Sequence, residues 1–287
     1  MKKILVIGGN GQLGNCFKKL SFAYEKDFEF NFTDSATVDI TDANSISDVF
    51  YDYQPHFCIN ASAYTAVDLA ETETEKAFAV NATGVANLAE ACAEYNTTLI
   101  HISTDYVFDG ETEISYSEDN FTNPQGVYGA SKLKGEELAL DLNPKTIVVR
   151  TSWLYSEFNK NFVKTMLNLF STKEELGIVA DQFGQPTNAN DLAEAVMKII
   201  ETEPKTYGVF HFSNYPETTW FGFAEKIAEL SNSTIKLNAI TTAQFPTPAK
   251  RPKRSTMCLD KIEETYKIDL QHWETSLAEC IQTLNNK

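Results

Sequence analysis

The stretch ILVIGGNGQLG, residues 4–14, decides the fold of this chain. A short apolar strand runs directly into the segment GGNGQLG at 8–14. Gly9, Gly11 and Gly14 satisfy the GxGxxG spacing, and Gly8, Gly11 and Gly14 satisfy the GxxGxxG spacing. Glycines permit a tight turn there and let the backbone approach a pyrophosphate, whose charge meets free amides at the start of the next helix. A plain strand-to-helix turn is the alternative, but the placement favours a dinucleotide site.

The regions around this turn alternate short β-branched runs with longer helical patterns, which is typical of crossover units in a parallel sheet. We therefore expect an α/β fold, a Rossmann-like doubly wound parallel sheet with a smaller, interleaved C-terminal substrate lobe. The predicted strands are 4–7, 28–33, 57–60, 98–103 and 146–150, with helices over 71–95 and 127–142. Later elements are helices near 161–171 and 189–201, strands near 178–181 and 207–212, a loop at 241–252 and two short C-terminal helices.

The expected domain division follows from these elements. The nucleotide-binding Rossmann domain takes residues 1–150 plus about 175–202 and 233–242. The substrate-binding lobe takes 151–174, 203–232 and 243–287.

Charge and composition exclude several classes of protein. Lys and Arg total 24 against 40 Asp and Glu, a net charge of -16 without a long basic stripe, so we expect no nucleic-acid partner. The five cysteines are odd in number and widely spaced, which predicts free thiols in a reducing cytoplasm. Nowhere do 18 apolar residues run together, so we expect no membrane partner and a cytoplasmic protein.

Asp34 stands at the end of the second predicted strand, about twenty residues past the last glycine. An acid at that place can accept a hydrogen bond from an adenosine ribose 2′-hydroxyl, which favours NAD weakly. An Asp that only opens the next turn is the alternative. The choice between NADH and NADPH therefore stays open.

Tyr128 and Lys132 stand four residues apart on a predicted helix, so their side chains share one face. A phenol with a pKa of about 10 is a poor acid near neutrality, and an adjacent ammonium lowers that pKa by favouring the phenolate. Thr104 follows the fourth strand at the carboxyl edge of the sheet, where open α/β sheets bind ligands. Ser103 could supply the hydroxyl instead, because strand alternation points only one of the two into the cleft.

These residues belong to a set of motifs that resembles one family, the extended short-chain dehydrogenase/reductases, and within it the dTDP-4-dehydrorhamnose reductases. The likeness spans nearly the whole chain. The motifs are GQLG at 11–14, NASAYTAVD at 60–68, STDYVF at 103–108, VYGASK at 127–132, RTSW at 150–153, NF at 161–162, DQFGQPT at 181–187 and PTPAKRP at 246–252.

The resemblance implies reduction of the C4 keto group of dTDP-4-dehydro-β-L-rhamnose by NADPH or NADH, giving dTDP-L-rhamnose. In that reaction Tyr128 donates the proton, Lys132 lowers its pKa and anchors the ribose, and Thr104 tunes the keto oxygen. The implied cofactor contacts are Gly8, Asn10, Gly11, Gln12, Leu13, Gly14, Asp34, Asp39, Ile40, Ala61, Ala63, Tyr64, Thr65, Ile102, Tyr128 and Lys132. The implied sugar-nucleotide contacts are Val67, Thr104, Asp105, Trp153 and Arg251.

Two of these residues have simpler alternatives. Trp153 could be a core aromatic, because tryptophan buries a large apolar area whatever its function. Arg251 lies in the basic strip Lys250–Arg254 of an acidic protein, which could be a solvated loop. We expect Arg251 to clamp the pyrophosphate, because a guanidinium binds phosphate through two parallel hydrogen bonds.

Other enzymes and other roles remain as alternatives. A nucleotide-sugar 4,6-dehydratase follows its Thr with an Asp-Glu pair, whereas Asp105 and Tyr106 follow Thr104 here. A 4-epimerase, a reductase of another keto sugar, or a non-catalytic regulatory subunit on the same fold stays open. The histidines lack metal-ligand spacing, and Asn15-Cys16 and Ala189-Asn190 replace the glutamates that hold magnesium at a dimer interface in some reductases. We therefore assign no metal, and a homodimer stays open.

Overall fold

A six-stranded parallel sheet forms the centre of the structure, a computed structural model that describes residues 1–286. Its strand order is β10-β5-β4-β3-β1-β2, and the five strands predicted from the sequence are all present. Every residue of β3 and β5 is buried, as expected for a parallel sheet covered on both faces. The strands are β1 (Lys2–Ile7), β2 (Phe28–Thr33), β3 (Phe57–Asn60), β4 (Thr98–Thr104), β5 (Thr146–Thr151) and β10 (Gly208–His211).

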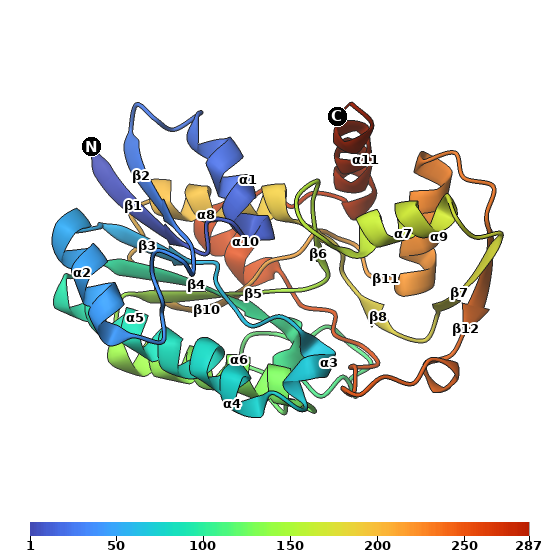
Figure 1. Cartoon of the computed structure of the whole chain (residues 1–287), viewed down its shortest axis with the longest axis horizontal. Coiled ribbons are helices and arrows are strands. Elements are labelled where there is room, and N and C mark those ends of the chain that lie inside the picture. Colours follow the sequence, from blue (N-terminus) through green and yellow to red (C-terminus); the bar gives the residue numbers. More distant parts are fainter. Residues whose placement is uncertain (287) are drawn as a thin grey trace.

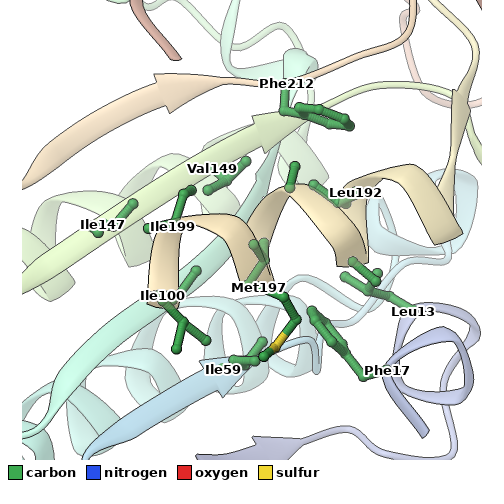
Figure 2. Packing of buried hydrophobic residues seen from close by; sticks show 14 of the residues in the cluster. Leu13, Phe17, Ile59, Ile100, Ile147, Val149, Leu192, Met197, Ile199 and Phe212 are labelled. Atoms are coloured by element: carbon green, nitrogen blue, oxygen red, sulfur yellow. The ribbon is translucent and has the colours of Figure 1, made fainter. Parts of the chain in front are cut away.

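Helices cover both faces of this sheet (Figure 1). One face packs against α1 (Gln12–Ser21), α8 (Ala189–Glu201) and α10 (Asp260–Tyr266), and the other against α2 (Ala43–Tyr53), α5 (Gly84–Glu94) and α6 (Val127–Leu142). Leu192, Val196 and Ile199 recur along one side of α8 and are fully buried, the pattern of an amphipathic helix. Figure 2 shows this side of α8 against the strands, with Leu13 and Phe17 of α1 closing the same core.

The long helix expected over 71–95 is interrupted. The chain forms α3 (Val67–Ala70), α4 (Thr74–Phe78), a π-helical turn at Ala79–Thr83 and then α5. Asn81 in the π-turn accepts a hydrogen bond from the Tyr64 amide at 2.8 Å and donates to the Tyr64 carbonyl at 3.0 Å. The same amide group donates to Ser131 on α6 at 3.0 Å. The turn therefore ties the loop after β3 to α6, and such turns are frequent at functional sites.

A second group of elements packs beside the sheet, on the right in Figure 1. Its helices share a core rich in aromatic side chains, which includes Tyr155, Phe223 and Trp273. The elements are β6 (Leu154–Tyr155) with β9 (Thr187–Asn188), β8 (Phe183–Gly184) with β11 (Thr218–Thr219), β7 (Glu175–Val179) with β12 (Lys236–Ile240), and the helices α7 (Phe162–Phe170), α9 (Trp220–Leu230) and α11 (Trp273–Asn285). Short 3-10 turns occupy Asp105–Val107 and Thr242–Gln244.

Four segments pack elsewhere than the expected domain division placed them. Strand β10, expected in the substrate lobe, pairs with β5 in the main sheet, and α10 packs into the same core through Ile262 and Tyr266. Strands β7 and β12, expected in the nucleotide domain, pair with each other, and Leu176 and Ile178 of β7 pack in the core of the second group. The apolar pattern reveals a strand, but its pairing partner depends on contacts distant in the sequence.

The cysteines and the helices bear on two further expectations. None of the five cysteines, which all lie within residues 1–286, forms a disulfide, and only Cys258 among them is not fully buried. Among the helices of residues 1–286, none combines the length and the apolar run that a membrane crossing requires.

Candidate active site

A cavity of about 900 Å³ opens at the carboxyl ends of the central strands, where open α/β sheets bind their ligands. It extends from the glycine turn after β1 to Trp153 and Asn161 at the second group of elements. The predicted site residues that line it are Gly8, Asn10, Gly11, Gln12, Leu13, Asp34, Asp39, Ile40, Ala61, Ala63, Tyr64, Thr65, Val67, Ile102, Thr104, Asp105, Tyr128, Lys132 and Trp153. Gly14 and Arg251 do not line it.

The glycine turn has the geometry that a pyrophosphate requires. Gly8 has φ +84°, and a methyl group on it would lie 2.8 Å from the Ser62 amide nitrogen. A methyl group on Gly14 would lie 2.3 Å from the Gly8 carbonyl oxygen, so this glycine lets α1 pack close to the turn. No side chain caps the first amides of α1 at Gly11, which leaves them free for an anion.

Asp34 opens the turn after β2 and also lines the cavity. Its Oδ1 accepts hydrogen bonds from the amides of Ala36 and Thr37 at 3.0 and 3.1 Å, so it does open the next turn. Its Oδ2 accepts a hydrogen bond from the side-chain Nδ2 of Asn10. Lys18 Nζ in turn donates to Asn10 Oδ1 at 2.7 Å. Asp34 also lines the cavity. A ribose hydroxyl bound there would donate to a carboxylate that already accepts hydrogen bonds from the backbone amides of the turn.

Thr104 and Tyr128 meet at the buried end of the cavity. Burial raises the pKa of Tyr128 to about 12, while a hydrogen bond with Thr104 opposes this rise. Thr104 Oγ1 donates to Asp105 Oδ1 at 3.1 Å and accepts from the Tyr106 amide at 3.2 Å, which fixes the hydroxyl. The phenol is therefore protonated and ready to donate at neutral pH.

Lys132 is almost completely buried, with 2% of its surface exposed. Its Nζ donates to the Ile102 carbonyl at 2.7 Å, and burial lowers the pKa of Lys132 to about 8. The expected lowering of the Tyr128 pKa by this ammonium is not seen, because desolvation of the phenolate outweighs it and the ammonium points at Ile102.

Asp105 places a carboxyl group beside this pair. Burial raises the pKa of Asp105 to about 6, against hydrogen bonds from Ser255 and Thr104 that favour the carboxylate. Only 2% of its surface is exposed. The side chain can therefore accept or donate a hydrogen bond to a hydroxyl-rich ligand near neutral pH.

Arg251 stands outside the cavity and is held by another residue. Its Nη1 and Nη2 donate to the two carboxylate oxygens of Asp68, each at 2.9 Å. The neighbouring Arg254 likewise donates to Glu217 at 2.7 Å. The basic strip is therefore neutralised by acids from other segments, which one sequence alone does not reveal.

The whole chain matches the family model described as RmlD substrate binding domain over residues 1–286. A dTDP-4-dehydrorhamnose reductase of Aggregatibacter actinomycetemcomitans is 42% identical over 96% of this chain and 97% of its own length. The chain belongs to the dTDP-4-dehydrorhamnose reductase family.

Solved structures of two family members have the same fold. The dTDP-4-dehydrorhamnose reductase of Clostridium acetobutylicum has a TM-score of 0.95 at 42% identity, covering 99% of both chains. That of Bacillus anthracis, solved in complex with NADP, has a TM-score of 0.95 at 36% identity over 99% of this chain and 100% of its own. The expected family and the Rossmann-like fold are therefore confirmed.

In this member of the reductase family, the Trp153 ring packs tightly against two residues of the second group of elements, Trp220 and Gly184. Its ring stacks on Trp220 with centroids 3.6 Å apart and planes 8° apart. A methyl group on Gly184 would lie 2.7 to 2.9 Å from three atoms of the Trp153 ring. Trp153 also has φ +47°, a left-handed conformation that non-glycine residues rarely adopt. It is thus packed like a core aromatic and also faces the cavity.

Several site residues escaped the sequence reasoning in this reductase. Thr151, Ser152 and Asn161 line the cavity, and the Thr151 hydroxyl is buried without a hydrogen-bond partner. Trp220 acts on the site only through Trp153. The motifs around residues 150–153 and 161–162 contained the first three, but nothing in the sequence around Trp220 indicates its partner.

Proposed function

We propose that this chain reduces the C4 keto group of dTDP-4-dehydro-β-L-rhamnose to give dTDP-L-rhamnose, with hydride supplied by bound NADPH or NADH and the proton by Tyr128. The observation that carries the proposal is the meeting of Thr104, Tyr128 and Lys132 in one cavity with the glycine turn. The names of the relatives and the NADP complex of the Bacillus anthracis reductase support it.

The residues present fit a dinucleotide. The turn at Gly8 and the uncapped start of α1 would hold the pyrophosphate, because the glycines let the backbone of the turn pack closely and no side chain caps the first amides of α1. Asp34 would accept from the adenosine ribose, and Lys132 from within the cavity would donate to the second ribose. Tyr64 and Thr65 line the wall between these points.

The chain's own groups then supply the acid chemistry. Tyr128 holds its proton at neutral pH because burial raises its pKa, and it gives that proton to the developing alkoxide. With substrate bound, the Thr104 hydroxyl would turn its single O–H from Asp105 to the same oxygen and stabilise its charge. Trp153 provides a flat face for the sugar ring, and Asp105 accepts from a sugar hydroxyl.

We infer that Arg251 binds the pyrophosphate of the sugar nucleotide and that Asp68 holds its guanidinium in place until then. Arg251→Ala should raise the KM for the sugar nucleotide while leaving that for the nicotinamide cofactor unchanged. An unchanged KM for the sugar nucleotide would show that Arg251 only ties the loop to α3.

The test mixes the purified chain with NADPH or NADH and freshly generated dTDP-4-dehydro-L-rhamnose. Loss of nicotinamide absorbance, with dTDP-L-rhamnose identified by NMR, is the expected result. Bound cofactor without turnover would refute the proposal and favour another keto sugar or the regulatory role.

We also infer that the enzyme works in a reducing, cytoplasmic compartment, because none of its five cysteines forms a disulfide. Cell fractionation of the producing organism, with the activity measured in each fraction, tests this. Activity confined to an oxidising compartment would contradict it.

A further inference from the structure

His101 is a buried titratable residue that the proposed reaction does not use. It lies on β4 with none of its surface exposed, between the catalytic Lys132 and the Asn60 side chain at the end of β3. His101 Nε2 is 3.4 Å from Lys132 Nζ, and His101 Nδ1 is 3.1 Å from Asn60 Nδ2. The ring therefore contacts the one ammonium group that faces the cavity from α6.

The orientation of Asn60 fixes which ring nitrogen of His101 carries the proton. Asn60 Oδ1 accepts from the Ser62 amide at 3.1 Å and from the Ser62 hydroxyl at 2.6 Å. A backbone N–H can only donate, so the oxygen must face Ser62 and Nδ2 must donate to His101. Nδ1 is thus an acceptor, and the network places the proton of the neutral ring on Nε2.

This tautomer opposes the charged form of Lys132. An ammonium has three donors and no acceptor, and Nζ already donates to the Ile102 carbonyl at 2.7 Å. A second N–H of the ammonium would meet the N–H of His101 head on. The neutral amine instead has a lone pair that can accept from His101 Nε2, so the fixed tautomer favours the amine.

The other charged groups around Lys132 act separately from this contact. Glu136, one turn further along α6, raises the pKa of Lys132, but its carboxylate is paired with Arg150 of β5 at 2.6 Å. Tyr128 lies one turn before Lys132, with Asp105 beside it. Burial itself lowers the pKa of Lys132 most. Among the hydrogen-bond contacts of Nζ within residues 1–286, the His101 ring is the one that can oppose the ammonium with an N–H.

On the same face of the sheet, the Cys58 and Cys92 thiols lie in the apolar core. Burial raises the pKa of Cys92, so this thiol is neutral at ordinary pH. Burial and the charge of Lys132 hold the pKa of His101 well below its usual value. The imidazole is therefore neutral, as the tautomer argument requires.

We propose that His101 is a positioning residue that sets the protonation of Lys132, with its tautomer fixed by Asn60. The inference rests on the proposed function, because that function gives Lys132 its role. A reductase that lacks this contact should keep Lys132 charged up to a higher pH. Any fall in kcat that reflects loss of the Lys132 proton should then move to higher pH.

The tautomer is tested without catalysis by NMR of the chain labelled with ¹⁵N-histidine. The four histidines are distinguished by single His→Gln variants. The expected result for His101 is a proton on Nε2 and no imidazolium between pH 6 and 9. A proton on Nδ1, or a ring that titrates in this range, would overturn the proposal.

The effect on Lys132 is tested by its own titration, read from ¹³C-lysine NMR and assigned with Lys132→Arg. His101→Leu removes the opposing donor and should raise the pKa of Lys132 by about 1, a tenfold change in the ratio of ammonium to amine. Leu99→Ala is the matched control, because Leu99 is fully buried on the same face of β4 and packs only in the apolar core. The control should leave the pKa unchanged.

A second variant preserves the test if His101→Leu does not fold. Asn60→Asp keeps the acceptor for Ser62 but presents a carboxylate oxygen to His101 Nδ1, which moves the ring proton to Nδ1. Nε2 then accepts from the ammonium, so the Lys132 pKa rises and the histidine signals report the new tautomer. An unchanged Lys132 pKa in the folded variants would overturn the proposal. Absence of reductase turnover in the wild type would refute the proposed function alone, since both NMR readings are independent of it.

Discussion

A methyl group placed at Gly184 should disturb the sugar end of the site without touching the cavity itself. In Gly184→Ala the new carbon would lie 2.7 Å from Trp153 Cε2, whereas carbon atoms make ordinary contact from about 3.5 Å. The ring would have to move by about 0.8 Å to restore that contact. The three atoms nearest to this carbon all belong to the Trp153 ring, which is also stacked on Trp220.

Trp220 restricts how the Trp153 ring can move. The two rings are already stacked at 3.6 Å, and Trp220 is backed by Phe162 with ring centroids 4.6 Å apart. The Trp153 ring must therefore tilt or slide, which changes the face that it would offer to a sugar. A misplacement of about 1 Å at a positioning group can cost about a hundredfold in rate, so we expect kcat/KM to fall by about 10- to 100-fold.

Steady-state kinetics with varied sugar nucleotide provides the assay. The loss should appear in the KM for the sugar nucleotide and in kcat, with the KM for the nicotinamide cofactor unchanged. Overpacking should also reduce stability by about 1–3 kcal/mol, measured by urea unfolding.

Gly177→Ala is the matched control. Its methyl group would lie 3.2 Å from the Ile240 side chain, in the same group of elements but against no ring of the site. It should change stability a little and kinetics not at all. A folded Gly184→Ala enzyme with wild-type kcat/KM would refute the view that the clamped Trp153 ring positions the sugar.

Three further predictions concern buried polar groups. Tyr128→Phe should lower kcat by about 10²- to 10⁴-fold while the cofactor still binds, and near-normal turnover would contradict the proton-donor role. The pKa of Asp105 in the folded chain lies above its unfolded value, so wild-type stability falls as pH rises from about 4 to about 6. Asp105→Asn should therefore recover up to about 3 kcal/mol of stability at pH 7 but little at pH 4. Thermal melts of both proteins across pH check this, and a gain that does not depend on pH would exclude the linkage. Glu136→Gln leaves the buried Arg150 charge uncompensated and should cost about 3–5 kcal/mol in urea unfolding, whereas a loss below about 1 kcal/mol would mean that the pair contributes little.

Local signals in the sequence predicted the nucleotide half of the fold well. The glycine turn, the five strands and α6 depend on neighbours in the chain, through apolar runs and turn chemistry, so their positions could be read directly. The placement of Tyr128 and Lys132 on one helix face followed from helical spacing alone.

Contacts between distant segments could not be read in this way. The pairing of β10 with β5 and of β7 with β12 depends on which partner buries each strand. The capture of Arg251 by Asp68 joins two motifs that the sequence presents separately. The Lys132 contribution to the Tyr128 pKa was overestimated, because burial of the phenol is a tertiary property.

The return of the chain to the main sheet limits how this enzyme could be rebuilt. After β5 the chain builds β6 to β9, then comes back with α8 and β10, and α10 closes the same core (Figure 1). A cut after Thr151 would remove an edge strand and one helical cover of Ile147 and Val149, which are fully buried. The second group of elements, which we propose binds the sugar, is therefore not an exchangeable module. New sugar specificity on this scaffold should come from substitutions in place, around Trp153 and the loops beside it.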